Sequence, residues 1–206
     1  MNNIKIKTKD RIIEAAGLLF SQQSYSSVTV LEICNQAECN IAAINYHFTN
    51  KENLYKQVLQ LATEAASKMT VLADKSLSAE KRISNLIYSR LKAIMNPSPK
   101  VIFPQLIHQE MQSPSPIHSQ VRADYLKPRY TEVEVLVEEF LGEVALPFQI
   151  QSATFSIYSQ CAFLNITSQN QKDFWQEISN DTVITEMHQI ILGGLIHYKS
   201  QLEVNR

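Results

Sequence analysis

The chain has 206 residues, enough for one large domain or for a small domain joined to a larger one. Its formal net charge of -1 excludes a globally basic nucleic-acid coat, so any anion-binding surface must be local. The longest apolar run, Ile190 to Ile196, has 7 residues, against the roughly 20 that a membrane-spanning helix needs. We therefore expect no membrane partner.

Cysteine usage and the first residues indicate a cytoplasmic protein. The cysteines at positions 34, 39 and 161 make an odd number without the spacing of a disulfide framework. The opening segment MNNIKIKTKD lacks the apolar region of a secretory signal. Reduced thiols in the cytoplasm are the expectation.

Helical periodicity dominates the chain and predicts an all-α fold. There are 4 glycines, and apolar residues recur at spacings of three and four. The first helix is predicted from about Thr8 to Gln23, with Thr8 as its cap and with Ile12 and Ala16 on its apolar face. It ends where residues 21–27 offer few helix formers.

A capping box marks the second helix. The Thr29 hydroxyl can accept from the backbone N–H of Glu32, while the Glu32 carboxylate can accept from that of Thr29. This short helix stops around residues 37–38. Asn40 then caps a third helix almost at once, because its side chain can accept from a free N–H in the next turn.

The later helices follow from their apolar periodicity and from the prolines between them. A long helix starts at Thr49-Asn50-Lys51-Glu52 and continues past residue 65. Prolines end helices because they lack a backbone N–H and restrict the preceding residue. The remaining helices are predicted at Ser78–Met95, Val101–Gln112, Ile117–Leu146 with a break near Pro128, Phe148–Thr167 and Asp181–Leu202.

Two short helices joined by a turn of a few residues, after an amphipathic helix, form a helix-turn-helix unit. In its second helix, CNIAAINYHF, we expect Ile44 and Phe48 to face inward with Cys39. At ~1.5 Å per residue the segment from Ile41 to Phe48 is about 12 Å long, close to the width of the DNA major groove. The residues left exposed are Ala42, Ala43, Asn45, Tyr46 and His47.

These exposed residues suit a duplex. Asn45 can pair with an adenine edge, while Tyr46, His47 and Lys51 can donate to phosphates. The alternative is an ordinary solvated face, since short motifs often match by chance. The order of capping box, short turn, small residues, polar triplet and lysine favours DNA binding. The N-terminal arm is also locally positive, with Lys5, Lys7, Lys9 and Arg11 against Asp10.

Residues 8 to 60 resemble the N-terminal DNA-binding domain of TetR/AcrR-family transcriptional regulators, above all in TKDRIIEAAGLLF, VTVLEICNQAECNIAAINYHF and NKENLY. The resemblance implies a DNA-binding domain in residues 1–50 and a helical effector-binding and dimerisation domain in residues 51–206. It implies a sequence-specific regulator, by family habit a repressor, that a small-molecule effector releases from a palindromic operator. The predicted DNA-binding residues are Lys7, Lys9, Thr29, Asn40, Ile41, Ala42, Ala43, Asn45, Tyr46, His47 and Lys51.

Two residues depart from the family pattern. The family usually has glycine in the turn, where a left-handed backbone is wanted, and this chain has Glu38. We expect strain of about 1 kcal/mol or a slightly different turn there. Ile41 at the exposed entry of the third helix can contact a thymine methyl but cannot hydrogen-bond a base.

The segments LIHQEMQSPSP, YLKPRY and SQCAFL are similar to the C-terminal domain of the CecR-like subgroup, which implies a ligand-sensing and dimerising body. The long helix from Lys51 is the predicted lever: ligand entry would move it and misplace Tyr46 and His47. Each candidate effector residue is also explained as plain core. The candidates are Tyr88, Phe103, Ile107, His108, Met111, Tyr130, Phe155, Tyr158 and Cys161.

The last helix predicts a homodimer. It is apolar nearly all round at residues 190–196, which favours one face on its own core and another on a partner. Gly193 and Gly194 would permit close helix approach. With residues 148–167 as its neighbour, a two-fold four-helix bundle through the two C-terminal helices follows. The alternative is a buried central helix in a monomer.

Other functions receive less support. An enzyme is not indicated, because no Gly-rich phosphate loop, G-x-S-x-G or H-E-x-x-H occurs, and we expect no cofactor. A helical protein-interaction module would lack a steep salt dependence on duplex DNA. A metal sensor would draw ligands from Cys34, Cys39, His108, His118 and His188.

Overall fold

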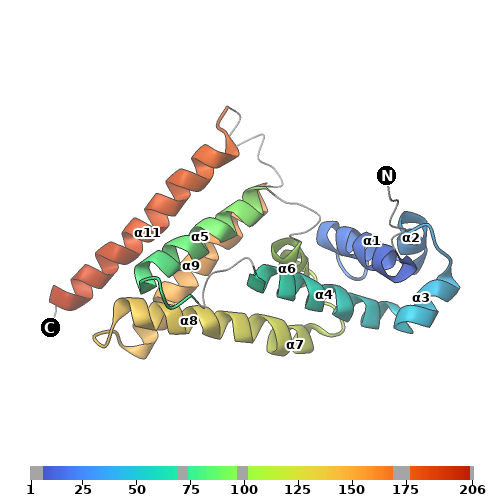
Figure 1. Cartoon of the computed structure of the whole chain (residues 1–206), viewed down its shortest axis with the longest axis horizontal. Helices are drawn as coiled ribbons and strands as arrows, with labels where there is room; N and C mark the ends of the chain where they lie inside the picture. Colours follow the sequence, from blue (N-terminus) through green and yellow to red (C-terminus); the bar gives the residue numbers. More distant parts are fainter. Residues whose placement is uncertain (1–6, 69–73, 97–101, 169–176, 205–206) are drawn as a thin grey trace. The chain divides into compact units, whose positions relative to one another are not determined.

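The computed structural model describes residues 7–68, 74–96, 102–168 and 177–204. Every regular element in these ranges is a helix, which confirms the predicted all-α fold (Figure 1). The chain forms two compact units. Unit 1 consists of Met1–Ser67 and Ser98–Tyr125, and unit 2 consists of Lys68–Pro97 and Leu126–Arg206.

Unit 1 contains α1 (Thr8–Gln22), α2 (Val30–Gln36), α3 (Ile41–Phe48), α4 (Lys51–Lys68), α6 (Phe103–Gln112) and α7 (His118–Val121). The predicted cap of the first helix is wrong, because Lys7 occupies the N-cap position without a side-chain hydrogen bond and Thr8 already belongs to the helix. Helices α1 and α6 pack closely. A Cβ at Gly17 would lie 2.8 Å from the Cδ1 of Ile102, so the bare backbone of Gly17 makes room for the start of α6.

A buried carboxylate joins three helices of unit 1. Glu110 of α6 is 1% exposed, and its Oε2 accepts a hydrogen bond from the Tyr55 hydroxyl of α4 at 2.8 Å. Its Oε1 accepts from the backbone N–H and hydroxyl of Ser115 at 3.1 and 2.9 Å, and lies 3.0 Å from Nδ1 of His118. Buried charge is costly unless it is hydrogen-bonded, so these contacts hold α4, α6 and the start of α7 in one arrangement.

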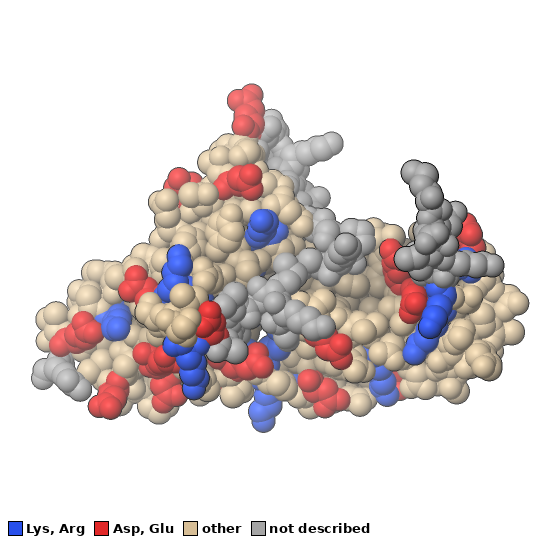
Figure 2. Space-filling model, viewed as in Figure 1, with Lys and Arg blue, Asp and Glu red and all other residues tan. Residues whose placement is uncertain are grey.

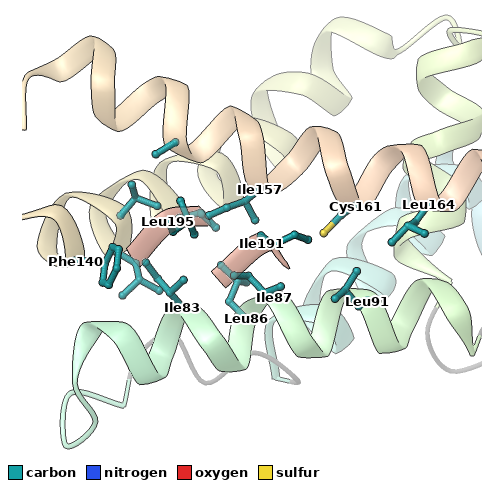
Figure 3. Packing of buried hydrophobic residues seen from close by; sticks show 14 of the residues in the cluster. Ile83, Leu86, Ile87, Leu91, Phe140, Ile157, Cys161, Leu164, Ile191 and Leu195 are labelled. Carbon is teal, nitrogen blue, oxygen red and sulfur yellow. The ribbon is translucent and has the colours of Figure 1, made fainter. Parts of the chain in front are cut away.

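Unit 2 contains α5 (Ala79–Met95), α8 (Lys127–Leu141), α9 (Pro147–Ser168) and α11 (Asn180–Val204). Helix α5 packs against the other three. Its Ile87 and Leu91 face Ile157 of α9 and Ile191 of α11 in an apolar core (Figure 3). The buried Arg82 of α5 forms an ion pair with Glu139 of α8. Burial of branched aliphatic side chains is thus the main source of cohesion in this unit.

The segment predicted as one broken helix from Ile117 to Leu146 consists of three pieces. A short π-helix, Arg122–Leu126, lies between α7 and α8, and Pro128 stands in the first turn of α8, where its missing N–H removes no intrahelical bond. The break near Pro128 is therefore confirmed. The predicted end at Leu146 is wrong, because α8 ends at Leu141, before Gly142 at φ +80°.

Candidate nucleic-acid interface

Helix α2 begins at the predicted capping box. The Thr29 hydroxyl accepts from the backbone N–H of Glu32 at 3.1 Å. One Glu32 carboxylate oxygen accepts from the backbone N–H of Thr29 at 2.7 Å and from its hydroxyl at 2.8 Å. These hydrogen bonds, first the one from the Thr29 backbone, hold the pKa of Glu32 below its usual value. Thr29 is exposed at the N-terminus of α2, as a residue that meets DNA must be.

The turn between α2 and α3 bends at a residue with a left-handed backbone. Glu38 has φ +51°, at the position where glycine was expected from the family pattern. The N–H of Cys39 donates to the Cys34 carbonyl at 3.0 Å and that of Glu38 donates to the Asn35 carbonyl at 3.3 Å, the hydrogen bonds of a Schellman motif. Arg11 of α1 donates from Nη2 to the Glu38 carbonyl at 3.2 Å, which helps to hold the turn.

Helix α3 is capped at its start and anchored from behind. The Asn40 side chain accepts from the backbone N–H of Ala43 at 2.9 Å. Ile44 is fully buried and Phe48 is 5% exposed, whereas Cys39 is half-buried. The cap fixes where the helix begins and the two apolar anchors fix its rotation. The face opposite them therefore points away from the core of unit 1.

That outward face carries the residues predicted to meet DNA. Asn45 is exposed, Tyr46 is 85% exposed and His47 is half-buried beside it, with ring centroids 5.0 Å apart. Ile41 is 50% exposed at the entry of the helix. Ala42 is exposed and Ala43 is half-buried, so small side chains lie beside the polar ones. None of the three polar side chains is turned into the protein interior.

The three lysines predicted to contact DNA, Lys7, Lys9 and Lys51, differ in their surroundings. Lys7 and Lys9 are exposed, and the Lys9 ammonium lies 5.9 Å from the centroid of the Phe48 ring, near the end of α3. Lys51 is instead used within unit 1: its Nζ donates to the Val28 carbonyl at 2.6 Å and lies 4.2 Å from the Tyr25 ring centroid. Burial lowers the pKa of Lys51. Its role toward phosphate stays a prediction.

A tight turn that the sequence did not reveal connects α3 to α4. Thr49 has φ +70° and ψ -46°, and the N–H of Asn50 donates to the Phe48 carbonyl at 2.8 Å, which makes a γ-turn. A β-branched residue rarely adopts a positive φ, so this junction is strained. Asn50 then caps α4 by accepting from the N–H of Asn53 at 2.8 Å. The threonine at position 49 is not a residue type that predicts such a turn.

Family comparisons match most of the chain. Residues 12–58 match the model of bacterial regulatory proteins of the tetR family, and residues 79–194 match that of the C-terminal domain of the HTH-type transcriptional dual regulator CecR. The chain belongs to the TetR family and has a CecR-type C-terminal domain. It is therefore a DNA-binding transcriptional regulator, and its helix-turn-helix is the family's DNA-binding element.

Individual relatives agree with this assignment. The chain is 27% identical over 139 residues to the "Probable HTH-type transcriptional regulator YttP" of Bacillus subtilis, a match that spans 66% of each protein. It is 35% identical over 52 residues, 25% of this chain and 28% of the relative, to the biofilm operon icaADBC negative regulator IcaR of Staphylococcus epidermidis. The crystal structure of AibR with isovaleryl coenzyme A and operator DNA has the same fold, at TM-score 0.69 and 14% identity over 89% of this chain and 97% of AibR.

The candidate effector residues of this TetR-family protein fall into two groups. Those on α6, which are Phe103, Ile107, His108 and Met111, belong to unit 1. The others, which are Tyr88, Tyr130, Phe155, Tyr158 and Cys161, lie on α5, α8 and α9 of unit 2. The two groups thus do not belong to one compact unit, and no local pattern in the sequence indicated this division.

Within unit 2 the second group divides again. The Tyr130 and Tyr158 rings stack with centroids 5.3 Å apart, and Cys161 is buried one turn further along α9. Burial raises the pKa of Cys161 to about 11. Tyr88 and Phe155 are 43% and 66% exposed, so both lie at the surface of unit 2.

Figure 2 shows acidic and basic side chains mixed over the visible face. Among the described residues, no group of three or more His, Cys, Asp or Glu side chains could hold a metal ion. Burial, and then the neighbouring Cys39, raises the pKa of Cys34, which disfavours the thiolate that a metal needs. None of the helices searched is both long and apolar enough to cross a membrane.

Proposed function

We propose that this regulator represses transcription as a homodimer, in which α3 of each copy contacts one half of a near-palindromic operator, and that a small-molecule effector lowers its affinity for that operator. The observation that carries the proposal is the outward polar face of α3, held by Ile44 and Phe48 from behind. Among the similar proteins, IcaR is a negative regulator and AibR was crystallised with both an acyl coenzyme A and operator DNA.

In this proposal the residues of α3 have separate tasks. Asn45 pairs with an adenine edge and so contributes sequence preference, whereas Tyr46 and His47 contact phosphates and contribute affinity. Ile41 contacts a thymine methyl and forms no hydrogen bond with a base. The DNA contacts would then lie in residues 1–50, where Lys7, Lys9 and Thr29 add to the contacts of α3, and at Lys51, while the rest of residues 51–206 would sense the effector and form the dimer.

The exposed surface of α9 and α11 supports the homodimer. Gly193 and Gly194 are exposed, and among the described residues no atom beyond their chain neighbours and the nearby backbone of α11 lies within 4 Å of a Cβ built on either, so a partner helix has room to approach. Large apolar side chains left exposed call for cover by another protein. On these two helices they are Phe148, Phe155, Phe163, Ile190, Ile196 and Val204.

Helix α4 is the proposed lever. Its first residue, Lys51, is bonded to the Val28 carbonyl just before the capping box, and its Tyr55 is bonded to Glu110 of α6. A movement of α6 or α4 would therefore be passed to the helix-turn-helix through hydrogen bonds. The effector must favour one position of this lever, because a ligand with equal affinity for both states shifts nothing.

Selection of bound sequences from random duplex DNA tests the function. We expect a two-fold symmetric motif, and binding that weakens steeply with salt. Asn45→Ala should relax the preference at one base of each half-site, whereas His47→Ala should weaken binding to all sequences nearly alike. A motif without symmetry would contradict the dimer, and unchanged specificity in Asn45→Ala would show that another residue contacts the base.

A further inference from the structure

Two cysteines lie at the two ends of the turn inside the helix-turn-helix. Cys34 is in the last turn of α2, and Cys39 is the residue before Asn40, the cap of α3. The N–H of Cys39 donates to the Cys34 carbonyl at 3.0 Å, so the backbone bond lengths keep the two Cα atoms within about 7 Å of each other. Beyond about 7 Å a disulfide cannot form without movement of the backbone. The turn thus holds this pair within reach of a disulfide.

The side chains of the pair lie on the same side of the turn. In a Schellman motif the third residue from the end of the helix commonly packs on the residue that follows the left-handed one. These two positions are occupied by Cys34 and Cys39, and the left-handed residue is Glu38. Cys34 belongs to the apolar core of unit 1, and Cys39 packs against the same core. The effect of Cys39 on the pKa of Cys34, noted above, agrees with this proximity.

The two thiols differ in their access to solvent. Both cysteines are free, but Cys34 is 3% exposed, whereas Cys39 is half-buried. A small solute therefore meets Cys39 first, and Cys34 is covered by the core. Redox-sensing cysteines often have this arrangement, in which an accessible thiol lies next to a second thiol that resolves its oxidised form.

The third cysteine provides a comparison. Cys161 is also a free cysteine, but it is buried in the core of unit 2 (Figure 3), and the other two cysteines of the chain both belong to unit 1. It thus has neither an accessible thiol nor a second cysteine in its own unit. Cys161 is therefore an internal reference for a reaction that is specific to the turn.

We propose that Cys34 and Cys39 form a reversible disulfide on reaction with a hydroperoxide such as hydrogen peroxide, and that this disulfide lowers the affinity of the regulator for its operator. The Cys39 sulfur attacks one peroxide oxygen, the O–O bond breaks, and one water leaves while Cys39 becomes a sulfenic acid. The Cys34 sulfur then attacks the Cys39 sulfur and displaces the sulfenic oxygen as a second water. Two thiols together lose two protons and two electrons, which reduce one hydrogen peroxide to two waters.

The disulfide would alter the position of α3. Its two sulfurs are about 2.05 Å apart, closer than two thiols in contact. Cys34 is held in the packed core, so Cys39 is the residue that must move. Because Cys39 directly precedes Asn40, whose side chain accepts from the Ala43 N–H, this movement reaches the start of α3. The inference rests on the proposed function only in its use of operator binding, since the disulfide itself is detected without DNA.

Peptide mapping of the full-length protein tests the pairing. The protein is treated with hydrogen peroxide, unreacted thiols are alkylated in denaturant, and the chain is digested without reductant by a protease that cleaves after glutamate. Cleavage at Glu38 separates residues 33–38 from residues 39–52, and each peptide contains one cysteine. We expect the two peptides to stay joined until dithiothreitol is added, and Cys161 to be recovered in its alkylated form.

Gel-shift titration with the duplex motif obtained by the selection described above measures the consequence. Peroxide should weaken binding by the unchanged protein about tenfold or more, and dithiothreitol should restore it. Cys39→Ser and Cys34→Ala each remove one partner, so both variants should keep the affinity of the reduced protein after peroxide. Asn35→Ser, at an exposed position between the two cysteines, is the matched control and should respond as the unchanged protein does. Melting curves show whether each variant is folded, and the tests on the unchanged protein need no variant.

Three results would overturn the proposal: no joined peptide pair within one chain, an operator affinity that the disulfide leaves unchanged, or a loss of affinity as large in Cys34→Ala as in the unchanged protein. The last result would assign the effect to oxidation of Cys39 alone. Reduced protein that binds no selected duplex would contradict the proposed function, whereas the peptide map would still decide whether the disulfide forms.

Discussion

The exposed face of α3 and the exposed face of α9 and α11 are chemically opposite. On α3 the most exposed large side chain is Tyr46, between Asn45 and His47, whereas α9 and α11 expose Phe155, Ile190 and other large apolar residues. Polar groups with hydrogen-bonding capacity fit a hydrated duplex, and apolar groups fit a dry protein interface. The kind of partner that each face binds can therefore be inferred from the chemical groups that the face leaves exposed.

The supports behind the two faces differ as well. Behind α3, unit 1 has a buried polar network around Glu110 in addition to its apolar core. Behind α9 and α11, the core shown in Figure 3 is apolar and consists mainly of aliphatic side chains, together with Phe140 and Cys161. Polar networks specify one arrangement of the helices that share them, whereas apolar packing mainly supplies stability. We expect substitutions in these two regions to have different effects on the protein.

The largest effect is expected from a charge on the apolar face. Ile190→Glu places a carboxylate among exposed apolar residues, which would have to be desolvated in a dimer. A monomer contacts only one half-site, so it loses the gain in affinity that comes from joining two half-site contacts in one dimer. Operator affinity should therefore fall by about a thousandfold. Analytical ultracentrifugation gives the oligomeric state and a gel-shift titration gives the affinity.

Thr131→Glu on α8 adds the same charge at an exposed position among other polar residues and is the matched control. It should leave both the dimer and the affinity near their original values. If the Ile190→Glu variant also stays dimeric, the apolar face of α9 and α11 is covered by something other than a second copy, and it is not the dimer interface.

The next largest effect is expected inside unit 1. Glu110→Ala removes the acceptor that Tyr55, Ser115 and His118 share and leaves their donors without a partner, which should lower the free energy of unfolding by about 3 kcal/mol. Glu110→Gln keeps the shape and an acceptor oxygen and should cost about 1 kcal/mol. Urea unfolding measures both. Equal losses would mean that the second carboxylate oxygen, which both variants lack as an acceptor, sets the cost, and not the space that alanine leaves empty.

A smaller, pH-dependent effect is expected for Tyr55. Burial, and then its hydrogen bond to Glu110, raises the pKa of Tyr55 above the ordinary value of about 10. A pKa raised in the folded state contributes stability that is fully present below about pH 10 and is lost as the pH rises further, because the unfolded chain ionises first. Tyr55→Phe should therefore cost about 1 kcal/mol at neutral pH and flatten the alkaline decline.

Unfolding by urea at several values between about pH 8 and pH 11 checks this prediction. Tyr125→Phe is the control for the hydrogen bond: the pKa of Tyr125 is also raised, so this variant should also flatten the alkaline decline, but its hydroxyl makes only a 3.5 Å contact with the Lys56 carbonyl, so it should cost less at neutral pH. An alkaline decline as steep in Tyr55→Phe as in the unchanged protein would contradict the role of the Tyr55 hydroxyl.

Local signals made the helix-turn-helix predictable. The Thr29 capping box and the Asn40 cap both act within three residues, and the inward Ile44 and Phe48 follow from a spacing of four. The family resemblance placed Glu38 in a left-handed turn, where it lies at φ +51°. Such features depend on neighbours in the sequence, so one sequence suffices to find them.

Long-range contacts were out of reach for the same reason. Tyr55 and Glu110 are 55 residues apart, and Arg90 and Tyr158 are 68 apart, so no periodicity connects them. The division of the effector candidates between the units also depends on how α6 packs against α1, which no local pattern encodes. The last helix, apolar nearly all round at residues 190–196, did not show from its sequence which residues its own core buries: Ile191 and Leu195 are buried, whereas Ile190 and Ile196 are exposed.

The smallest effect is expected at the turn that presents α3. Glu38→Gly removes the Cβ that disfavours φ +51°, while the hydrogen bond from Arg11 goes to the backbone carbonyl and is kept, so the free energy of unfolding should rise by about 1 kcal/mol. Glu38→Gln keeps the Cβ and removes the charge, so it should leave stability nearly unchanged and separate strain from electrostatics. Both variants remove a negative charge next to α3 and should raise DNA affinity alike, by a few-fold at low salt. Urea unfolding and gel-shift titration measure the two quantities, and a gain in stability as large in the glutamine variant would mean that charge repulsion, not backbone conformation, is the cost that Glu38 imposes on the turn.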